Sequence, residues 1–235
     1  MKNERKFDSF DEYANEYREI HDENIKITGE DSNYFSEHKI LEIKSVEKDY
    51  IKKLNILDLG CGDGNSYEYF NTHFPNCQYS GIDISEDSIE IAQRKFKNKN
   101  DFKTFNGIQI PFEDKKFDIV FIACVLHHID HKLHDEILLE VHRVLKKEGR
   151  LYIFEHNQYN PITRHIVNTC PFDKDAVLLP PYKLKRTLKS LCFKQNKLNF
   201  ILFFPRHRLF KYLFVLEKHI NWIPIGGQYY TRSIV

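Results

Sequence analysis

The chain has 235 residues, of which 41% are hydrophobic and 29% charged, and a net charge of +1; these values suit one α/β domain with added segments and exclude a disordered chain. No apolar stretch is long enough to span a bilayer, and residues 1–13 lack the apolar segment of a secretory signal. The five cysteines are odd in number and far apart, which argues against a disulfide framework or a structural zinc site, so we expect a cytoplasmic protein.

The first third of the chain is predicted to be helical. Two helical stretches cover residues 10–24 and 34–52, and the polar segment 29–33 separates them. Within that segment, Asp31 or Ser32 is a candidate N-cap of the second helix. A helical segment is therefore expected ahead of the first strand.

From residue 55 onward, apolar strands alternate with polar helices. Ser85 is a candidate N-cap of one helix, and Gly149 is expected to end another. The near-continuous apolar run FDIVFIACV is typical of a central strand covered on both faces. The alternation indicates right-handed βαβ crossovers and a mainly parallel sheet in an α/β fold. The predicted strands are 55–59, 78–84, 102–106, 117–125, 150–155, 196–204 and 228–235, and the predicted helices are 65–74, 86–98, 131–147, 183–191 and 208–221.

The stretch ILDLGCGDG places glycines and acids where the first strand ends, the edge at which parallel sheets bind ligands. Gly60, Gly62 and Gly64 would let a ligand approach the backbone and the next helix N-terminus. Asp58 within a strand needs a cation or donors, and a bound ammonium would satisfy it. Asp83 ends the second strand, where a carboxylate can accept from both hydroxyls of a ribose. The spacing D-x-G-x-G-x-G, in place of G-x-G-x-x-G, therefore favours a ligand made of an amino acid and a nucleoside over a dinucleotide.

Five blocks in order resemble the class I S-adenosylmethionine-dependent methyltransferases: ILDLGCGDG, GIDIS, NGIQIPFEDKKFD, FDIVFIACVLHHI and EVHRVLKKEGRLYIFEH. The resemblance implies a Rossmann-like, seven-stranded, mostly parallel sheet with helices on both faces and an antiparallel last strand. It also implies S-adenosylmethionine as the cofactor. By the same resemblance, residues 1–52 form an N-terminal helical lid, 53–157 the cofactor-binding core, and 158–235 a C-terminal part of the same domain with acceptor-binding insertions.

The resemblance further assigns cofactor contacts. The glycine loop would approach the methionine end, with an acid beneath the ammonium, and the acid of the second strand would hold the ribose. Asn106 stands where the family often has Asp, and its uncharged oxygen would accept from the adenine amino group more weakly. Cys124, at the end of the fourth strand, would close over the methyl group. The expected cofactor-binding residues are Asp58, Gly60, Cys61, Gly62, Gly64, Asp83, Ile84, Asn106 and Cys124.

Polar residues follow the fourth and fifth strands and are the candidates for chemistry: His127, His128, Glu155 and His156. Methyl transfer from a sulfonium needs an acceptor held in line, and a hydroxyl acceptor also needs a base. We expect His128 to be that base, because it matches a histidine common in related enzymes. His127 is expected to point into the structure, and Glu155 to orient a histidine or bind acceptor hydroxyls. The alternative is that both histidines cap and pack beneath the cofactor.

The segment HHIDHKLHDE has metal-like spacing, because His127 and His131 are four residues apart, as are His131 and Asp135. Metal-dependent relatives that methylate catechols use acids at these strand ends. Here the fourth strand ends in Ala123 and Cys124 without an acid. We therefore favour a surface helix start and predict no metal site.

The predicted reaction is O-methylation of a small molecule or sugar, with a lipid-linked glycan as one form of the acceptor. Residues 180–235 carry eleven Lys and Arg and one acid, Glu217, a charge of +10 against −9 for the remainder. Their basic, aromatic pattern is compatible with peripheral contact with an anionic membrane, but a predicted helix 208–221 that only covers the sheet is the preferred interpretation. Nucleic acid is not favoured, because no N-P-P-Y or D-P-P-Y block is present. The alternatives are a catalytically silent cofactor-binding or interaction protein, and an aminopropyl-type transferase, whose acidic site would have only Glu155.

Overall fold

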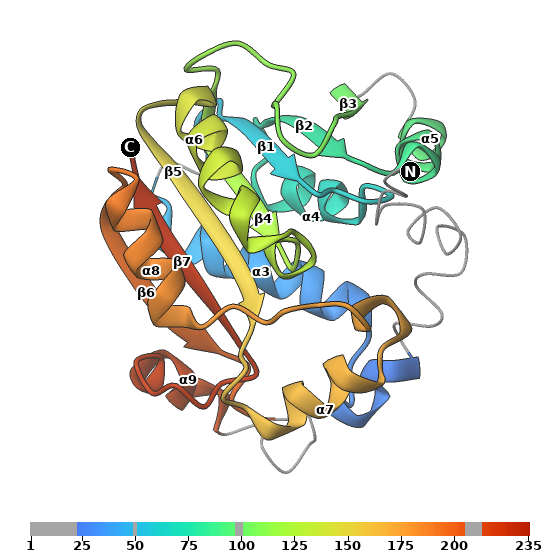
Figure 1. The fold of residues 1–235 in the computed structure, drawn as a ribbon, viewed down its shortest axis with the longest axis vertical. Coiled ribbons are helices and arrows are strands. Elements are labelled where there is room, and N and C mark those ends of the chain that lie inside the picture. The colour runs from blue at the N-terminus through green and yellow to red at the C-terminus, as the bar shows by residue number, and fades with distance from the viewer. Residues whose placement is uncertain (1–22, 49–50, 97–100, 205–212) are drawn as a thin grey trace.

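The computed structural model describes residues 23–48, 51–96, 101–204 and 213–235. A seven-stranded sheet with the strand order β3-β2-β1-β4-β5-β7-β6 forms the centre of this described part (Figure 1). β7 is antiparallel to both of its neighbours, and the other pairs are parallel. This confirms the predicted Rossmann-like sheet with its antiparallel last strand. The strands are β1 (Asn55–Leu59), β2 (Gln78–Asp83), β3 (Asp101–Thr104), β4 (Phe117–Ala123), β5 (Leu145–His156), β6 (Lys194–Ile201) and β7 (Gln228–Ile234).

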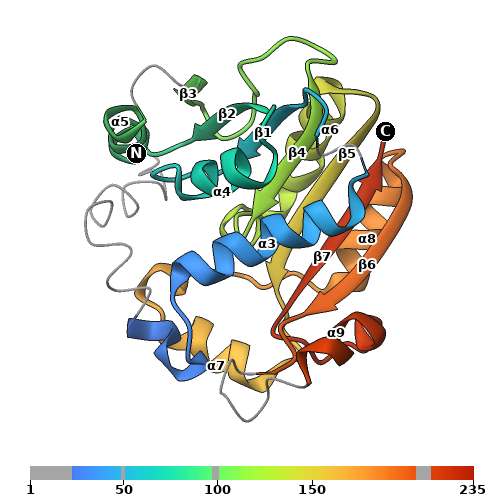
Figure 2. The ribbon, with the colours of Figure 1, turned by 180° about the vertical axis from the view of Figure 1, so that it is seen from behind.

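Helices cover both faces of the sheet, as predicted. α6 and α8 lie on the face seen in Figure 1, whereas α3 and α4 lie on the opposite face, seen in Figure 2. α7 lies beyond the carboxyl ends of β4 and β5 in both views. None of the described helices is long and apolar enough to cross a bilayer. The helices are α3 (Ser32–Val46), α4 (Asn65–His73), α5 (Glu86–Lys95), α6 (His134–Val144), α7 (Pro161–Thr169), α8 (Pro181–Ser190) and α9 (Phe214–Ile220), with 3-10 turns at Lys26–Thr28, Leu126–His128, His131–Leu133 and Pro171–Asp173.

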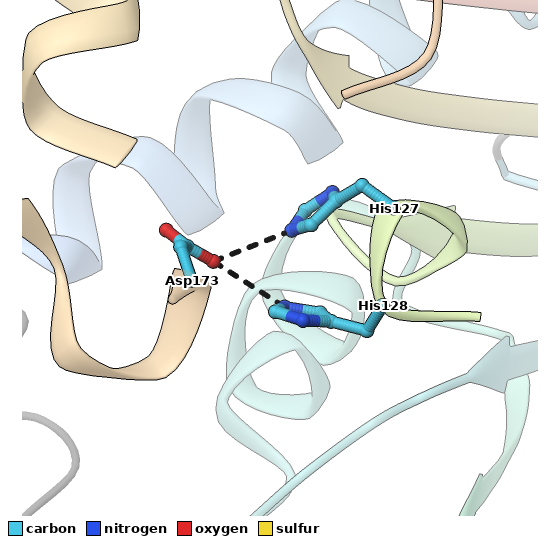
Figure 3. A group of neighbouring side chains, drawn as sticks. All are labelled: His127, His128 and Asp173. Carbon is cyan, nitrogen blue, oxygen red and sulfur yellow. Dashed lines mark ion pairs between the residues drawn. The ribbon is translucent and has the colours of Figure 1, made fainter. Parts of the chain in front are cut away.

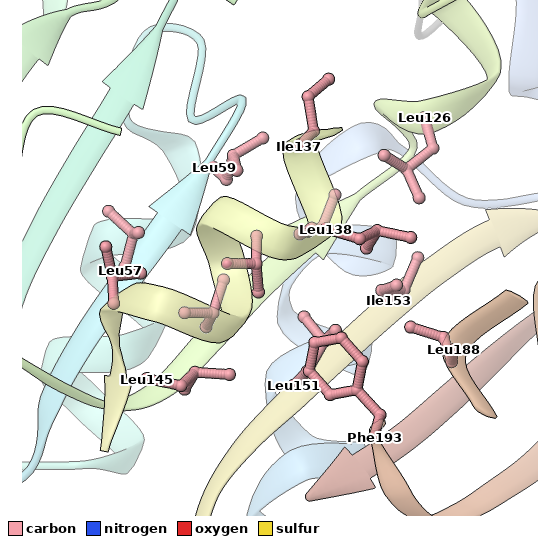
Figure 4. Close-up of a cluster of buried hydrophobic side chains, with 14 of the residues drawn as sticks. Leu57, Leu59, Leu126, Ile137, Leu138, Leu145, Leu151, Ile153, Leu188 and Phe193 are labelled. Atoms are coloured by element: carbon pink, nitrogen blue, oxygen red, sulfur yellow. The ribbon is translucent and has the colours of Figure 1, made fainter. Parts of the chain in front are cut away.

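β4 contributes to a hydrophobic core on each side of the sheet because successive side chains of a strand point to opposite faces. Val120 and Ile122 pack in the core beneath α6 and α8, part of which Figure 4 shows. Ile119 and Phe121 pack in the second core, which includes Ile40 of α3. Burial on both faces accounts for the unbroken apolar run in the sequence.

Two predicted N-caps are present. The Asp31 carboxylate accepts from the backbone N–H of Tyr34 at 2.8 Å at the start of α3. The Ser85 hydroxyl accepts from the N–H of Ser88 at 3.1 Å at the start of α5. Each side chain satisfies a donor that the first helical turn leaves unpaired, so local sequence decides where these two helices begin.

Several predicted boundaries are wrong. α6 ends at Val144 and not at Lys147, because Leu145 already pairs with Phe117 in the sheet. Gly149 therefore lies within β5 and does not end the helix. Strand β3 ends at Thr104, before Asn106.

The predicted end of the second helix at residue 52 is also wrong. α3 ends at Val46, because Glu47 turns to extended backbone and its carboxylate binds Tyr152 and Arg150 on β5. Residues 1–22 and 205–212 lie outside the described residues. The helices predicted at 10–24 and 208–221 are therefore described only at residues 23–25 and in α9, respectively.

The order of the strands places a cleft at the carboxyl ends of β1 and β4, because the chain runs outward from this pair in opposite directions. Asp58 of β1 lies opposite Gly81 of β2 and Phe121 of β4. Gly60 then turns close beneath the β4 loop, and a Cβ on it would lie 2.3 Å from Cγ2 of Val125. Only glycine fits this approach without displacement of the neighbouring chain.

Candidate cofactor and acceptor site

A cavity of about 900 Å³ opens at the carboxyl ends of the parallel strands, within the range of about 300–1,000 Å³ that is usual for small-molecule sites. The glycine loop after β1 forms one part of its wall, and the segments after β4 and β5 form another. α3 and α7 contribute side chains from the remaining sides. Of the expected cofactor-binding residues, all but Gly64 line it: Asp58, Gly60, Cys61, Gly62, Asp83, Ile84, Asn106 and Cys124.

The glycine loop is held by the end of β2. Gly60, Gly62 and Gly64 all have positive φ, at 80°, 52° and 77°. The Asp83 carboxylate accepts from the N–H of Gly62 at 2.8 Å and from the N–H of Ser85 at 3.0 Å. These two bonds hold the carboxylate in a fixed orientation at the wall of the cavity.

Asp58 is a buried carboxyl beneath this loop, with 1% of its surface exposed. The Tyr79 hydroxyl donates to its Oδ2 at 2.6 Å. Burial raises the pKa of Asp58 to about 7, and the neighbouring charge of Asp83 adds to the effect. A ligand ammonium placed at Asp58 would compensate the buried charge, which is the role predicted from the sequence. Tyr79 lies on the neighbouring strand β2 and was not predicted from the sequence.

Three other expected contacts have distinct geometries. The oxygen of Asn106 accepts from the N–H groups of Ile108 and Gln109 at 3.0 and 2.8 Å, so an adenine amino group would compete with both bonds. Cys124 has a φ of 58° immediately after β4, and its Sγ lies 3.9 Å from Nε2 of Gln228. The Cys61 thiol is buried, and burial raises its pKa well above the usual value, which keeps it protonated.

The predicted polar residues after β4 and β5 form a cluster with Asp173. His127 Nδ1 is 2.5 Å from Oε2 of Glu155, whose Oε1 accepts from the N–H of Leu126 at 2.9 Å. His127 Nε2 and His128 Nε2 lie 3.5 and 3.4 Å from the same Asp173 oxygen (Figure 3). Asp173 was missed in the sequence because it lies in a separate 3-10 turn, 45 residues beyond His128.

Charge is divided unequally within this cluster. Burial disfavours a charge on His127, but Glu155 and Asp173 outweigh it and raise the pKa of His127 well above the usual value. Burial opposes the charge on Asp173 also, but the surrounding histidines lower its pKa to about 2. Burial and the charge of His127 lower the pKa values of His128 and His156 to about 4. At neutral pH, a cationic His127 thus lies between two carboxylates, with two neutral histidines beside it.

The arrangement allows two kinds of chemistry. His128 is neutral, lines the cavity and keeps 20% of its side chain exposed, so it can accept a proton from a bound hydroxyl. His127, His128 and Asp173 also offer three potential metal ligand atoms within 4.8 Å of one another. This set differs from the spacing seen in the sequence. His131 is exposed, and the Nε2 of His134 donates to the carbonyls of Leu126 and Ile129.

Comparisons with known proteins identify a methyltransferase domain in the chain. The sequence profile described as "Methyltransferase domain" matches residues 57–153. A demethylmenaquinone methyltransferase of Lactococcus lactis is 34% identical over 127 residues, which cover 52% of this chain and 50% of that protein. An uncharacterized protein of Methanocaldococcus jannaschii is 30% identical over 193 residues, 80% of this chain and 82% of that protein.

Solved structures share the fold. A SAM-dependent methyltransferase from Archaeoglobus fulgidus superposes with a TM-score of 0.68 at 18% identity, over 87% of this chain and 95% of that one. The chain spans about half the length of the demethylmenaquinone methyltransferases of Lactococcus lactis and Lactobacillus johnsonii.

Proposed function

The chain belongs to the class I S-adenosylmethionine-dependent methyltransferases, and from this premise we propose that it transfers the methyl group of S-adenosylmethionine to a hydroxyl of a small molecule or sugar. One observation carries the proposal. The same cavity holds a buried acid suited to an ammonium, a second acid suited to a ribose, and a neutral histidine suited to a hydroxyl proton. These residues are Asp58, Asp83 and His128.

The residues present fit the cofactor of this family. Asp58 would bind its ammonium and Asp83 its ribose hydroxyls, while Ile84 would pack against the adenine. The loop after β1 approaches the loop after β4 closely at Gly60, where a side chain would collide with Val125. When bound, S-adenosylmethionine supplies an electrophilic methyl group on a sulfonium, so the protein has to orient the acceptor and receive its proton.

His128 is the proposed base. It accepts the acceptor's hydroxyl proton as the oxygen lone pair forms its bond to the methyl carbon and the carbon–sulfur bond breaks. The carboxylate of Asp173, 3.4 Å from His128 Nε2, would stabilise the imidazolium that results. His127 and Glu155 act as positioning residues in this scheme, because their short contact holds one wall of the cluster. His156 would lie beside the acceptor.

The residues that bind the methyl acceptor are proposed to lie outside the cofactor-binding core of residues 53–157. Residues 1–52 would act as a helical lid, and 158–235 would supply acceptor-binding insertions. α7 supports this division, because Ile162, Thr163 and Ile166 line the cavity. Glu155 already bonds His127 and Leu126, which weighs against the acidic polyamine site of an aminopropyl transferase.

A second candidate reaction is methylation of a ring carbon in a quinol. The similarity to demethylmenaquinone methyltransferases favours it. The same base would serve, because removal of a hydroxyl proton makes the adjacent ring carbon nucleophilic. O- and C-methylated products differ in their proton NMR spectra, so one product analysis separates the two candidates.

We also propose peripheral contact with an anionic membrane and a cytoplasmic location. Val215, Trp222 and Ile225, in and after α9, are 71%, 71% and 59% exposed, and Lys218 lies between them in sequence. α9 and α7 lie at the same end of the molecule (Figures 1 and 2). All five cysteines are free, which supports a reducing compartment. Sedimentation with anionic liposomes at low salt tests the contact, and failure of the protein to pellet would contradict it.

The direct test of the proposed function is release of S-adenosylhomocysteine in the presence of hydroxylated aromatic compounds and sugars. Release that depends on an acceptor supports a methyltransferase. Calorimetric binding of S-adenosylmethionine with no release for any compound would support the silent cofactor-binding alternative.

A further inference from the structure

Lys39 is a buried lysine in the wall of the cavity. It lies in the middle of α3, lines the cavity, and has only 7% of its surface exposed. Its neighbours Ile40 and Ile43 are fully buried in the core, which fixes this face of the helix against the sheet. α3 runs across the face of the sheet that Figure 2 shows. The ammonium is therefore held at a defined place and is not a flexible surface charge.

The contacts of Lys39 leave its charge without a counterion among the described residues. Its Nζ makes one hydrogen bond, to the backbone carbonyl of Phe35 at 3.3 Å, one helical turn earlier. A backbone carbonyl carries no net charge, and an ammonium has three donors. A buried cation is costly unless an anion or several acceptors compensate it, so this position is suited to a charged ligand group.

Lys39 lines the same cavity as Cys124 and His156, which follow β4 and end β5. Its positive charge acts on Cys124 and His156, at the ends of β4 and β5, and favours the lower pKa of each. Gln228 also lines the cavity next to Cys124, and its buried Oε1 has no hydrogen-bond partner within the described part of the chain. The lining of the cavity thus includes a buried cation and a residue with an unsatisfied amide oxygen.

We propose that Lys39 binds an anionic group of the methyl acceptor, so that the enzyme selects hydroxylated acids over neutral hydroxyl compounds. The inference rests on the proposed function and adds the charge of its substrate. The anion would pair with the Lys39 ammonium, and the hydroxyl of the same molecule would face His128. A donor hydroxyl or amide on the acceptor could meet the Gln228 oxygen. Apolar side chains such as Phe35 and Ile166 would contact its body.

The test uses two probes that differ in one carboxylate, 2,5-dihydroxybenzoate and hydroquinone. Each is titrated by calorimetry into the full chain saturated with S-adenosylhomocysteine. We expect the acid to bind at least about tenfold more tightly than hydroquinone, and the Lys39→Met variant to lose that preference. Lys44→Met removes the same charge from the same helix but not from the cavity wall, so it should keep the preference.

Each outcome has a distinct meaning. Equal affinity of the wild type for both probes, or an unchanged preference in Lys39→Met, overturns the inference while leaving the proposed function intact. A tenfold loss of S-adenosylhomocysteine affinity in Lys39→Met would assign the anion to the cofactor's own carboxylate and also overturn it. Absence of S-adenosylhomocysteine binding by the wild type would instead contradict the proposed function. Thermal unfolding of both variants controls for folding, and we expect no loss of stability because Met keeps the apolar stem.

Discussion

Asp58→Asn should stabilise the folded protein at neutral pH while weakening its binding of S-adenosylmethionine. The wild-type carboxyl is fully buried with a pKa of about 7, compared with 3.8 in its ordinary state. That difference corresponds to about 4 kcal/mol of unfavourable free energy for the ionised folded form. Asn has no charge and can still accept the hydrogen bond from the Tyr79 hydroxyl, which is 2.6 Å from the carboxylate.

The sign of the pH dependence follows from proton binding. Between about pH 4 and pH 7, the unfolded state loses the Asp58 proton while the folded state keeps it. Wild-type stability from this group is therefore present at low pH and declines by about 1.4 kcal/mol per pH unit until pH 7. The free energy of unfolding of Asp58→Asn minus that of the wild type should therefore rise by about 1.4 kcal/mol per pH unit, to about 4 kcal/mol at pH 8.

Urea unfolding at several pH values measures this difference. The exposed Asp175→Asn is the matched control, and it should change the unfolding free energy by less than about 0.5 kcal/mol at every pH. In calorimetry, loss of the charged partner should weaken S-adenosylmethionine binding by about 1.5–3 kcal/mol, roughly tenfold or more. A constant difference between Asp58→Asn and the wild type across the pH range would refute the buried-carboxyl reasoning. Unchanged cofactor affinity would refute the ammonium contact.

Three further predictions concern the base, the loop and metal. His128→Ala should lower kcat by about 10²–10⁴-fold and leave cofactor affinity nearly unchanged. His131→Ala, at an exposed position, should leave kcat unchanged. Full activity of His128→Ala would show that His128 is not the base. Gly60→Ala should lower the free energy of unfolding by about 2 kcal/mol or more, because the position combines a φ of 80° with a collision at Val125. Gly29→Ala, at a φ of 83° in open space, should lower it by only about 1 kcal/mol, and equal losses would contradict this reasoning. Val125→Ala should partly restore the stability of Gly60→Ala. Chelation with EDTA should leave turnover unchanged. If EDTA abolishes turnover and added Zn²⁺ restores it, the histidine cluster is a metal centre.

The sequence predicts the central sheet well because its signals are local. The near-continuous apolar run of β4 specifies a strand buried on both faces. Asp31 and Ser85 mark helix starts through bonds to residues three positions away. The end of α6 was misjudged because it depends on pairing of Leu145 with Phe117, which no local pattern reveals.

The site residues, too, are predictable only where their sequence signal is local. The glycine loop and Asp83 are recognisable because their spacing is set by one βαβ unit. Asp173 and Lys39 carry no such spacing, since each reaches the cavity from an element that is distant along the chain. The high pKa of Asp58 likewise depends on burial by several elements, although a carboxylate inside a strand already indicated a costly charge.

The central claim is that one cavity orients a sulfonium amino acid at Asp58 and its nucleoside at Asp83, with the sulfur toward His128. A crystal structure of the full chain with S-adenosylhomocysteine measures this most directly. The account predicts the ligand ammonium within hydrogen-bond distance of Asp58, the ribose hydroxyls on Asp83, and the sulfur facing the space beside Cys124 and His128. A ribose bound away from Asp83, or a sulfur directed away from that space, would contradict it.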